Sequence, residues 1–162
     1  MAEITTVTTL KSPKRNKAVG MYLIEINDGE VKTRQGYLIR DNASSQELTI
    51  QLLANALHII NRVKCDKAYV KVSIDEPRVA GAINNKWLDE WKANGWQTSK
   101  GKEVANAESW KILEEKMADK EIEISTEPSS YTNYLRYQAE KLLERSNEDA
   151  RTKENDKNSD KA

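Results

Sequence analysis

The chain has 162 residues, which is enough for one domain with a sizeable core. Lysine plus arginine equals aspartate plus glutamate at 26 each, so no overall charge favours nucleic acid or a membrane surface. The single cysteine and single histidine exclude an internal disulfide framework and metal sites that need several of these residues. Because the sequence also has no long apolar span, we expect a soluble intracellular protein of the cytoplasm.

The first part of the chain predicts three antiparallel strands. Residues 3–10, EITTVTTL, are rich in β-branched side chains and form the first expected strand. Residues 11–20, KSPKRNKAVG, contain proline, glycine and four basic side chains, which indicates a loop. MYLIEIN and EVKTRQGYLI then flank the turn Asn27-Asp28-Gly29, which is a strong hairpin signal.

The second part of the chain predicts helices that alternate with strands. Apolar residues recur at helical spacing after the hairpin, and short β-branched runs follow. The expected elements are a helix at 46–63, a strand at 68–74, helices at 77–93 and 106–118, a strand at 121–125 and a helix at 130–145. This order predicts an α/β fold whose mixed five-stranded sheet joins three antiparallel strands to crossover strands and is flanked by helices.

The C-terminal segment has a different composition from the rest. From Arg145 onward it carries no aromatic residue and no aliphatic residue larger than alanine, so it cannot bury enough surface to offset its ordering entropy. We therefore predict one domain over 1–145 and a disordered charged tail over 146–162, or a helix that frays after residue 145.

These elements and several local motifs resemble the ribonuclease H family, in its type 1 bacterial form with a basic handle. The resemblance covers roughly residues 3–144. QEL, which ends at Leu48, is similar to the family's Glu-Leu opening of the first helix, and VSIDEPRVAGAI is similar to its strand-ending aspartate followed by a helix. The segment 85–110, with tryptophans at 87, 91, 96 and 110, is similar to the family's protruding basic handle.

The resemblance implies a site with four carboxylates that hold two divalent ions and cleave RNA in an RNA/DNA hybrid. Glu47 and Asp75 match two of these acids. Leu10 stands in the place of the first acid, and Gln138 is the nearest equivalent of the fourth. The resemblance thus implies a degenerate member without a firmly bound cofactor, in which Glu47 and Asp75 hold at most one weakly bound Mg²⁺ or Mn²⁺.

Both remaining acids also have a structural interpretation. Ser44 and Glu47 form a capping box at the start of the first helix. Asp75, which precedes Pro77, is a suitable N-cap for the next helix. We favour these capping roles over metal ligation, with Glu127 as a weak candidate for a surrogate acid and Glu140 expected on a different helix face from Gln138.

Basic and aromatic residues outline a candidate nucleic-acid surface, for which a solvated loop is the alternative. Its members are Lys11, Lys14, Arg15, Lys17, Asn42, Trp96, Lys100 and Lys102. The favoured function is therefore a non-catalytic scaffold that binds an RNA/DNA hybrid, another nucleic acid or a protein partner, and not a membrane. A weak Mg²⁺- or Mn²⁺-dependent endoribonuclease that uses Glu47, Asp75 and a surrogate acid is one alternative. A structural protein-interaction module is the other.

Overall fold

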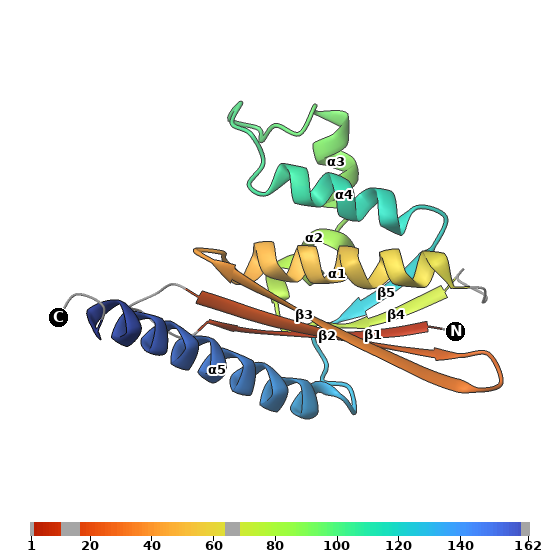
Figure 1. The fold of residues 1–162 in the computed structure, drawn as a ribbon. Coiled ribbons are helices and arrows are strands. Elements are labelled where there is room, and N and C mark those ends of the chain that lie inside the picture. Colours follow the sequence, from red (N-terminus) through yellow and green to blue (C-terminus); the bar gives the residue numbers. More distant parts are fainter. Residues whose placement is uncertain (1, 11–16, 64–68, 160–162) are drawn as a thin grey trace.

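The structure, a computed structural model, describes residues 2–10, 17–63 and 69–159. One sheet has the strand order β3-β2-β1-β4-β5 (Figure 1). Its strands are β1 (Ala2–Leu10), β2 (Lys17–Asn27), β3 (Val31–Asp41), β4 (Tyr69–Ser73) and β5 (Glu121–Ser125). The first three strands pair antiparallel, whereas β4 runs parallel to both β1 and β5. The predicted mixed sheet is therefore confirmed.

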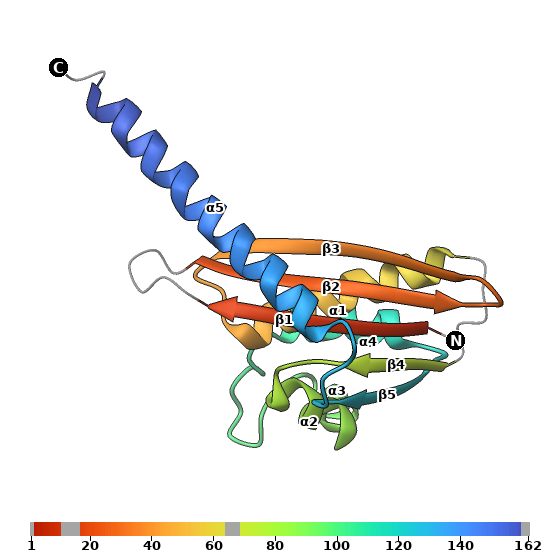
Figure 2. The same cartoon turned by 90° about the horizontal axis from the view of Figure 1, so that it is seen from below.

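Helices cover both faces of this sheet. They are α1 (Ser45–Arg62), α2 (Pro77–Asn84), α3 (Trp87–Ala93), α4 (Ala107–Met117) and α5 (Thr132–Ser159). Figure 1 shows α1 directly on one face, with α3 and α4 stacked beyond it, and α5 on the opposite face. Figure 2 shows α5 crossing the sheet near β1 and β2 and then running out beyond it. No helix in the described ranges is both long and apolar enough to cross a bilayer.

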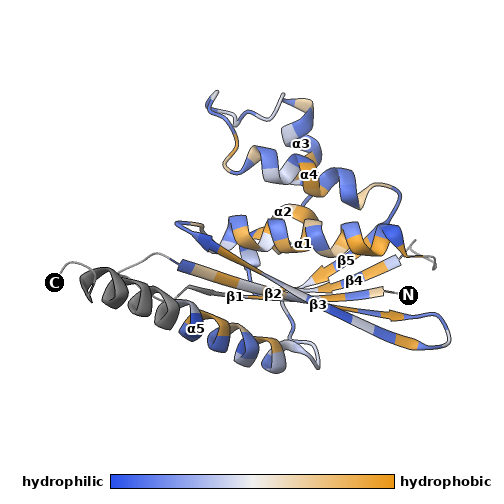
Figure 3. Cartoon of the chain, in the orientation of Figure 1, coloured by the Kyte–Doolittle hydropathy of each residue, from blue (hydrophilic) through white to orange (hydrophobic). Residues whose placement is uncertain are grey.

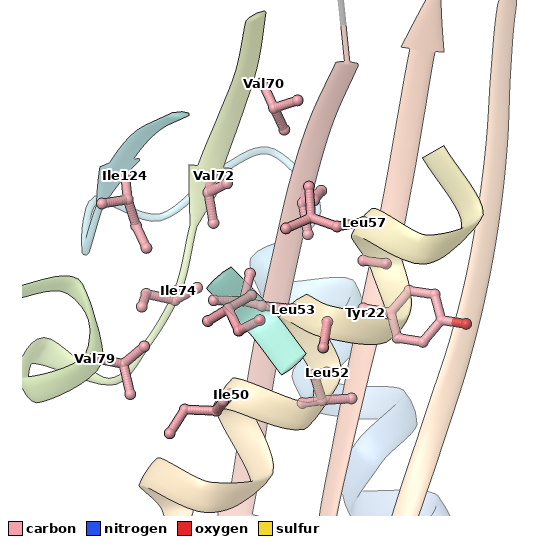
Figure 4. Packing of buried hydrophobic residues seen from close by; sticks show 14 of the residues in the cluster. Tyr22, Ile50, Leu52, Leu53, Leu57, Val70, Val72, Ile74, Val79 and Ile124 are labelled. Atoms are coloured by element: carbon pink, nitrogen blue, oxygen red, sulfur yellow. The ribbon is translucent and has the colours of Figure 1, made fainter. Parts of the chain in front are cut away.

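The alternation of side chains along β1 divides the core between the two faces of the sheet. Ile4 belongs to the large cluster under α1, whereas Val7 belongs to a smaller cluster under α5. Figure 4 shows the large cluster, in which Leu53 and Leu57 of α1 lie among side chains from the strands. Figure 3 shows hydrophobic residues on α1 and on the first half of α5, as burial of one helix face requires.

β2 begins at Lys17, so the prediction of a loop over the whole of residues 11–20 was wrong for its last four residues. Leu10 pairs with Ala18, which extends the antiparallel ladder to that point. Gly20 lies under α1, where an added Cβ atom would stand 2.5 Å from Cδ1 of Leu52. The glycine that suggested a loop therefore allows close packing of helix and strand.

The predicted helix over residues 77–93 is two helices, so that prediction was wrong about continuity. Lys86 lies between α2 and α3 with φ of 57° and ψ of 34°, which is the left-handed conformation. Such a residue cannot continue a right-handed helix, and the chain changes direction there.

Two further segments bear on the domain limits. α5 continues to Ser159, so the structure gives a helix over 146–159 where the composition suggested disorder, and residues 160–162 lie outside the described part. Lysine, glutamate and arginine are good helix formers, and neither glycine nor proline interrupts this segment. The domain limit at residue 145 stays a prediction. At the other side of the sheet, β3 is an edge strand with mostly exposed side chains.

Candidate functional site

Asp75 follows β4, and its carboxylate turns back onto β1. The Thr8 backbone N–H donates a hydrogen bond to Oδ2 at 3.0 Å, and the Thr8 hydroxyl donates to Oδ1 at 3.4 Å. The N-cap of α2 is Glu76, whose side chain accepts a hydrogen bond from the Arg78 N–H. The predicted capping role of Asp75 was therefore wrong, because β1 offers this carboxylate two donors and the next residue takes over the cap.

The strand register decides which residue of β1 lies level with Asp75. In the parallel pair, Thr5 lies opposite Ser73. Extended two residues past the end of β4, the same register would put Val7 level with Asp75, and both residues line one pocket. Leu10 lies three residues beyond Val7. The register therefore favours Val7 over Leu10 as the residue in the place of a strand-borne acid.

α5 brings a cation and a second carboxyl group toward Asp75. Arg136 and Glu140 are four residues apart on α5, and together with Asp75 they line a pocket of about 280 Å³. Residues at this spacing share one helix face, and Gln138 lies on another. Arg136 and Glu140, rather than Gln138, thus share a pocket with Asp75.

The surroundings of Asp75 act on its pKa in opposite directions. Burial raises the pKa of the Asp75 carboxyl and is the largest effect. The hydrogen bond from the Thr8 N–H and the positive charge of Arg136 both lower the pKa of the same group. The carboxyl group is thus held in a partly desolvated place beside one cation.

This pKa predicts how stability depends on pH. Because the pKa of Asp75 in the folded protein lies above its ordinary value of 3.8, the folded state binds this proton more tightly than the unfolded chain does. The resulting stabilisation is present at acid pH and is lost as the pH rises through the folded-state pKa. Asp75→Asn removes that loss, so its melting temperature should gain on that of the wild type between about pH 4 and about pH 7. Thermal melts across this range measure the melting temperature of Asp75→Asn minus that of the wild type. If this difference falls as the pH rises, burial is not the cause.

Glu47 lies at the first turn of α1. Ser44 is the N-cap, and its hydroxyl accepts a hydrogen bond from the Glu47 N–H at 3.1 Å, which confirms the predicted capping role of Ser44. The Glu47 side chain accepts a hydrogen bond from the Gln51 amide at 3.5 Å. The Ser45 hydroxyl donates to Glu76 at 2.7 Å and so links the start of α1 to the end of β4.

The residues around Asp75 do not fit a pair of divalent ions. Val7 offers only methyl groups, the Thr8 hydroxyl already bonds to the carboxylate, and Arg136 adds a positive charge that opposes a metal ion. Within residues 2–10, 17–63 and 69–159, no group of three or more histidine, cysteine, aspartate or glutamate side chains could hold a metal. The side chain of Glu127, the predicted surrogate, is exposed, and it is the Glu127 backbone carbonyl that accepts from the Ser73 hydroxyl.

The predicted nucleic-acid residues are distributed over three places. Lys11, Lys14 and Arg15 lie outside the described residues. Lys17 donates a hydrogen bond from Nζ to the Ser146 hydroxyl at 3.0 Å, which ties the start of β2 to α5. Asn42 is exposed at the end of β3 with φ of 59°.

The handle (residues 85–110) is built on its tryptophans. Trp91 contacts Trp87, Trp96 and Trp110, with ring centroids 6.3, 6.5 and 5.6 Å apart, and Trp110 is buried. Trp96 is half-buried against the core. The predicted packing role of Trp91 is confirmed, because Trp91 packs against the large cluster, whereas Trp87 contacts Trp91 but is 42% exposed. The two handle lysines, Lys100 and Lys102, are exposed near a turn.

Comparison with known proteins reveals sequence relatives, although no family model matches the chain. Ribonuclease H of Clostridium botulinum is 31% identical over 101 residues, which are 62% of this chain and 64% of the relative. Ribonuclease H of Caldicellulosiruptor saccharolyticus is 26% identical over 113 residues, which are 70% of this chain and 74% of the relative. The chain is thus similar in sequence to bacterial ribonucleases H over roughly 100 residues. It spans less than two thirds of the length of the Clostridium relative.

Solved structures confirm the ribonuclease H fold. A type 1 RNase H with the type 2 active-site motif has a TM-score of 0.68 at 14% identity, over 85% of this chain and 69% of that chain. The foamy viral protease-reverse transcriptase in complex with dsDNA also has a TM-score of 0.68, at 22% identity, over 87% of this chain and 90% of that chain. The same viral protein in complex with an RNA/DNA hybrid has a TM-score of 0.67 at 20% identity, over 84% of this chain and 18% of that chain.

Sequence reasoning missed three residues of the site around Asp75, namely Val7, Thr8 and Arg136. The first two lie in the threonine-rich run ITTVTTL, whose residues have similar β-strand propensity, so only the pairing register identifies them. Arg136 is identified only when the face of α5 that turns toward Asp75 is known. Gln138, two residues further along, lies on a different face of the helix.

Proposed function

We propose that this chain is a nucleic-acid-binding member of the ribonuclease H family, with an RNA/DNA hybrid as its ligand, and that it does not cleave that ligand by two-metal chemistry. Sequence similarity to ribonucleases H and the shared fold support binding, since the structurally similar foamy viral protein forms complexes with dsDNA and with an RNA/DNA hybrid. Fold alone does not carry chemistry, so the catalytic half of the proposal rests on the site.

One observation carries the non-catalytic half, namely the presence of Arg136 and Val7 beside Asp75. A two-metal centre needs several carboxylates converging on the same small volume. Here a guanidinium group lines the pocket with Asp75, and the β1 residue level with Asp75 is apolar. The positive charge beside Asp75 comes from the protein itself.

Exposed cations provide contact surfaces for the sugar-phosphate backbone. Lys100 and Lys102 are exposed on the handle, and half-buried Lys17 begins β2, next in sequence to Lys11, Lys14 and Arg15, which lie outside the described residues. Phosphate contacts of this kind give binding that weakens steeply as salt rises.

Purified protein incubated with a labelled RNA/DNA hybrid, in Mg²⁺ and separately in Mn²⁺, tests both halves of the proposal. We expect a shifted band on a native gel, intact RNA on a denaturing gel, and a shift that weakens as salt rises. A double variant Lys100→Gln/Lys102→Gln should weaken the shift, whereas a matched double variant of two exposed lysines on β3 and β4, Lys32→Gln/Lys71→Gln, should change it less. Neither a shift nor cleavage would contradict the proposal and favour a protein-interaction module.

A second candidate function is a weak metal-dependent endoribonuclease. The observation that favours it is Glu140, which lines the same pocket as Asp75 and could provide a second carboxylate. Under this alternative the hybrid is cut in Mn²⁺, and both Asp75→Asn and Glu140→Gln abolish the cleavage. Cleavage that survives Asp75→Asn would point to a contaminating nuclease.

A further inference from the structure

β3 is the outer strand of the sheet on the side away from β5, and its free edge is long and regular. Figure 2 shows it along the border of the sheet, with no other described strand beyond it. All 11 of its residues, Val31–Asp41, pair with β2 in one continuous register, and none of them is proline. Proteins commonly protect an edge by a short strand, a proline or a bulge, and β3 has none of these.

The backbone of this edge has unused hydrogen-bonding groups. In an antiparallel pair, alternate residues turn both the N–H and the C=O away from the partner strand. Among the described residues, no backbone group outside β2 bonds to the backbone of β3. The side-chain bond found there is local, since Arg40 Nη1 donates to the Ile39 carbonyl at 3.1 Å. A further strand would therefore meet an open ladder along most of β3.

The two sides of β3 differ in chemistry, and the side toward α1 is basic. Ile39 packs against the cluster under α5 and Leu38 against the cluster under α1, so odd-numbered residues face α5 and even-numbered residues face α1. Lys32, Arg34 and Arg40 are exposed on the α1 side, where β3 carries no acid. The ion pairs found among the described residues use none of these three cations.

The position between these cations is occupied by a hydroxyl group from the neighbouring strand. Gly36 has no side chain, and the hydroxyl of Tyr22 on β2 lies where the Cβ atom of another residue would stand. The α1 side of the edge thus presents ammonium, guanidinium and phenol groups in a row. A carboxylate can accept a hydrogen bond from each of them, whereas a cation of a partner strand would be repelled.

The side of β3 toward α5 is apolar and aromatic. Val31 and Tyr37 are 57% and 56% exposed on that side. Tyr134 of α5 is 44% exposed, and its hydroxyl donates to the Gln35 side-chain oxygen at 3.0 Å, which holds the ring beside β3. Large exposed apolar groups that gather on one surface mark a contact site. Apolar side chains of a further strand would cover them.

We propose that β3 binds an extended segment of a partner protein as a sixth strand, and that this segment alternates acidic with apolar residues. Its acidic side chains lie on the α1 side against Lys32 and Arg34, and its apolar side chains lie on the α5 side against Val31 and Tyr37. The alternation follows from the two-residue period of a strand and holds for parallel and antiparallel addition alike. The edge is separate from the surfaces assigned to the hybrid, so this inference does not rest on the proposed function.

Fluorescence anisotropy measures the binding of a labelled synthetic peptide that alternates glutamate with valine. We expect saturable binding, and about tenfold weaker binding of a peptide with the same composition in which all glutamates precede the valines, because only alternation matches the two sides of β3. Proline in place of the central valine should abolish binding, since it removes a ladder donor. No binding of the alternating peptide, or equal affinity for the unalternated one, would overturn the proposal.

A charge reversal on β3 tests the protein side of the contact. Lys32→Glu/Arg34→Glu changes two exposed side chains, so the protein should fold, lose the glutamate peptide and gain affinity for a peptide that alternates lysine with valine. Tyr37→Ser should weaken the binding of the glutamate peptide through the apolar side. The handle variant Lys100→Gln/Lys102→Gln is the matched control and should bind the peptide like the wild type. Unchanged affinity for both peptides in Lys32→Glu/Arg34→Glu would overturn the proposal.

Amide hydrogen exchange locates the bound peptide on the sheet. We expect slower exchange at alternate residues of β3 when the glutamate peptide is added, because their outward N–H groups become bonded. β5 is the other edge of the described sheet and carries the exposed acids Glu121 and Glu123, so its exchange should not change. Protection along β5, or none along β3, would contradict strand addition at β3.

Titration of the labelled hybrid separates this inference from the proposed function. Lys32→Glu/Arg34→Glu should bind the hybrid like the wild type while it loses the peptide, and Lys100→Gln/Lys102→Gln should do the reverse. If the hybrid competes with the peptide and also requires Lys32 and Arg34, the edge binds nucleic acid and the proposal is overturned. A free protein that sediments as a dimer, and as a monomer after Tyr37→Ser, would assign the edge to a second copy and overturn it as well. Peptide binding without hybrid binding would support the edge and contradict the proposed function.

Discussion

Val7→Asp should lower the free energy of unfolding by roughly 3–5 kcal/mol at neutral pH, because it places a carboxylate in an apolar environment without a partner. Val7 is 0% exposed and packs with Leu135 and Ala139 of α5. The register also places the new carboxylate level with Asp75, so the two like charges would repel each other. Urea denaturation at equilibrium measures the loss.

Two control variants are needed. One separates the effect of charge from that of polarity at Val7, and the other compares Val7 with Leu10 as the place of the first acid. Val7→Asn has a similar shape to Val7→Asp without the charge, so the difference between them should shrink as the pH falls toward about 4. Leu10→Asp tests the assignment made from the sequence, under which the acid belongs three residues further along the strand. If Leu10→Asp costs more stability in EDTA than Val7→Asp, the register argument is wrong and Leu10 holds the first acid's place.

Leu135→Ala should cost roughly 2–5 kcal/mol, which is the usual range when a fully buried leucine is truncated. Leu135 is 0% exposed and lies between α5 and the sheet, where it contacts the cluster around Val19 and Met21. For a chain of this size the melting temperature should fall by about 2–4 °C for each kcal/mol lost. Differential scanning calorimetry measures both quantities.

Leu142→Ala is the matched control for Leu135→Ala. Leu142 is also on α5 and packs against the same cluster, but it is only half-buried, so its truncation should cost clearly less. Equal losses for the two variants would show that α5 is not anchored at Leu135.

Much of the fold could be predicted from local sequence signals. β-branched runs, the Asn27-Asp28-Gly29 turn and the apolar period of α1 each specify their own element, and the order of elements then determines the mixed sheet. The break at Lys86 was missed because lysine is not a residue type that indicates a left-handed backbone conformation. The start of β2 was missed because Gly20, which serves close packing, also occurs in loops.

The candidate site could be predicted only in part. Asp75 stands out because a strand ends there, but the identity of its partner depends on pairing between β1 and β4. The threonine-rich run ITTVTTL gives no reason to prefer one register, so the sequence alone does not distinguish Leu10 from Val7. Which face of α5 turns toward Asp75 also depends on tertiary packing. The structure places Arg136 rather than Gln138 in the pocket with Asp75.

The free edge of β3 affects the solubility of this protein. Its outer backbone groups have no partner strand within the described sheet, and such an edge can template pairing with another copy. Lys32, Arg34 and Arg40 lie exposed along this edge, so two copies that approach edge to edge bring like charges together. Dissolved salt screens that repulsion, with a Debye length of about 10 Å at 0.1 M. The charged edge thus keeps copies apart best in dilute buffer, and concentrated salt removes this protection against aggregation.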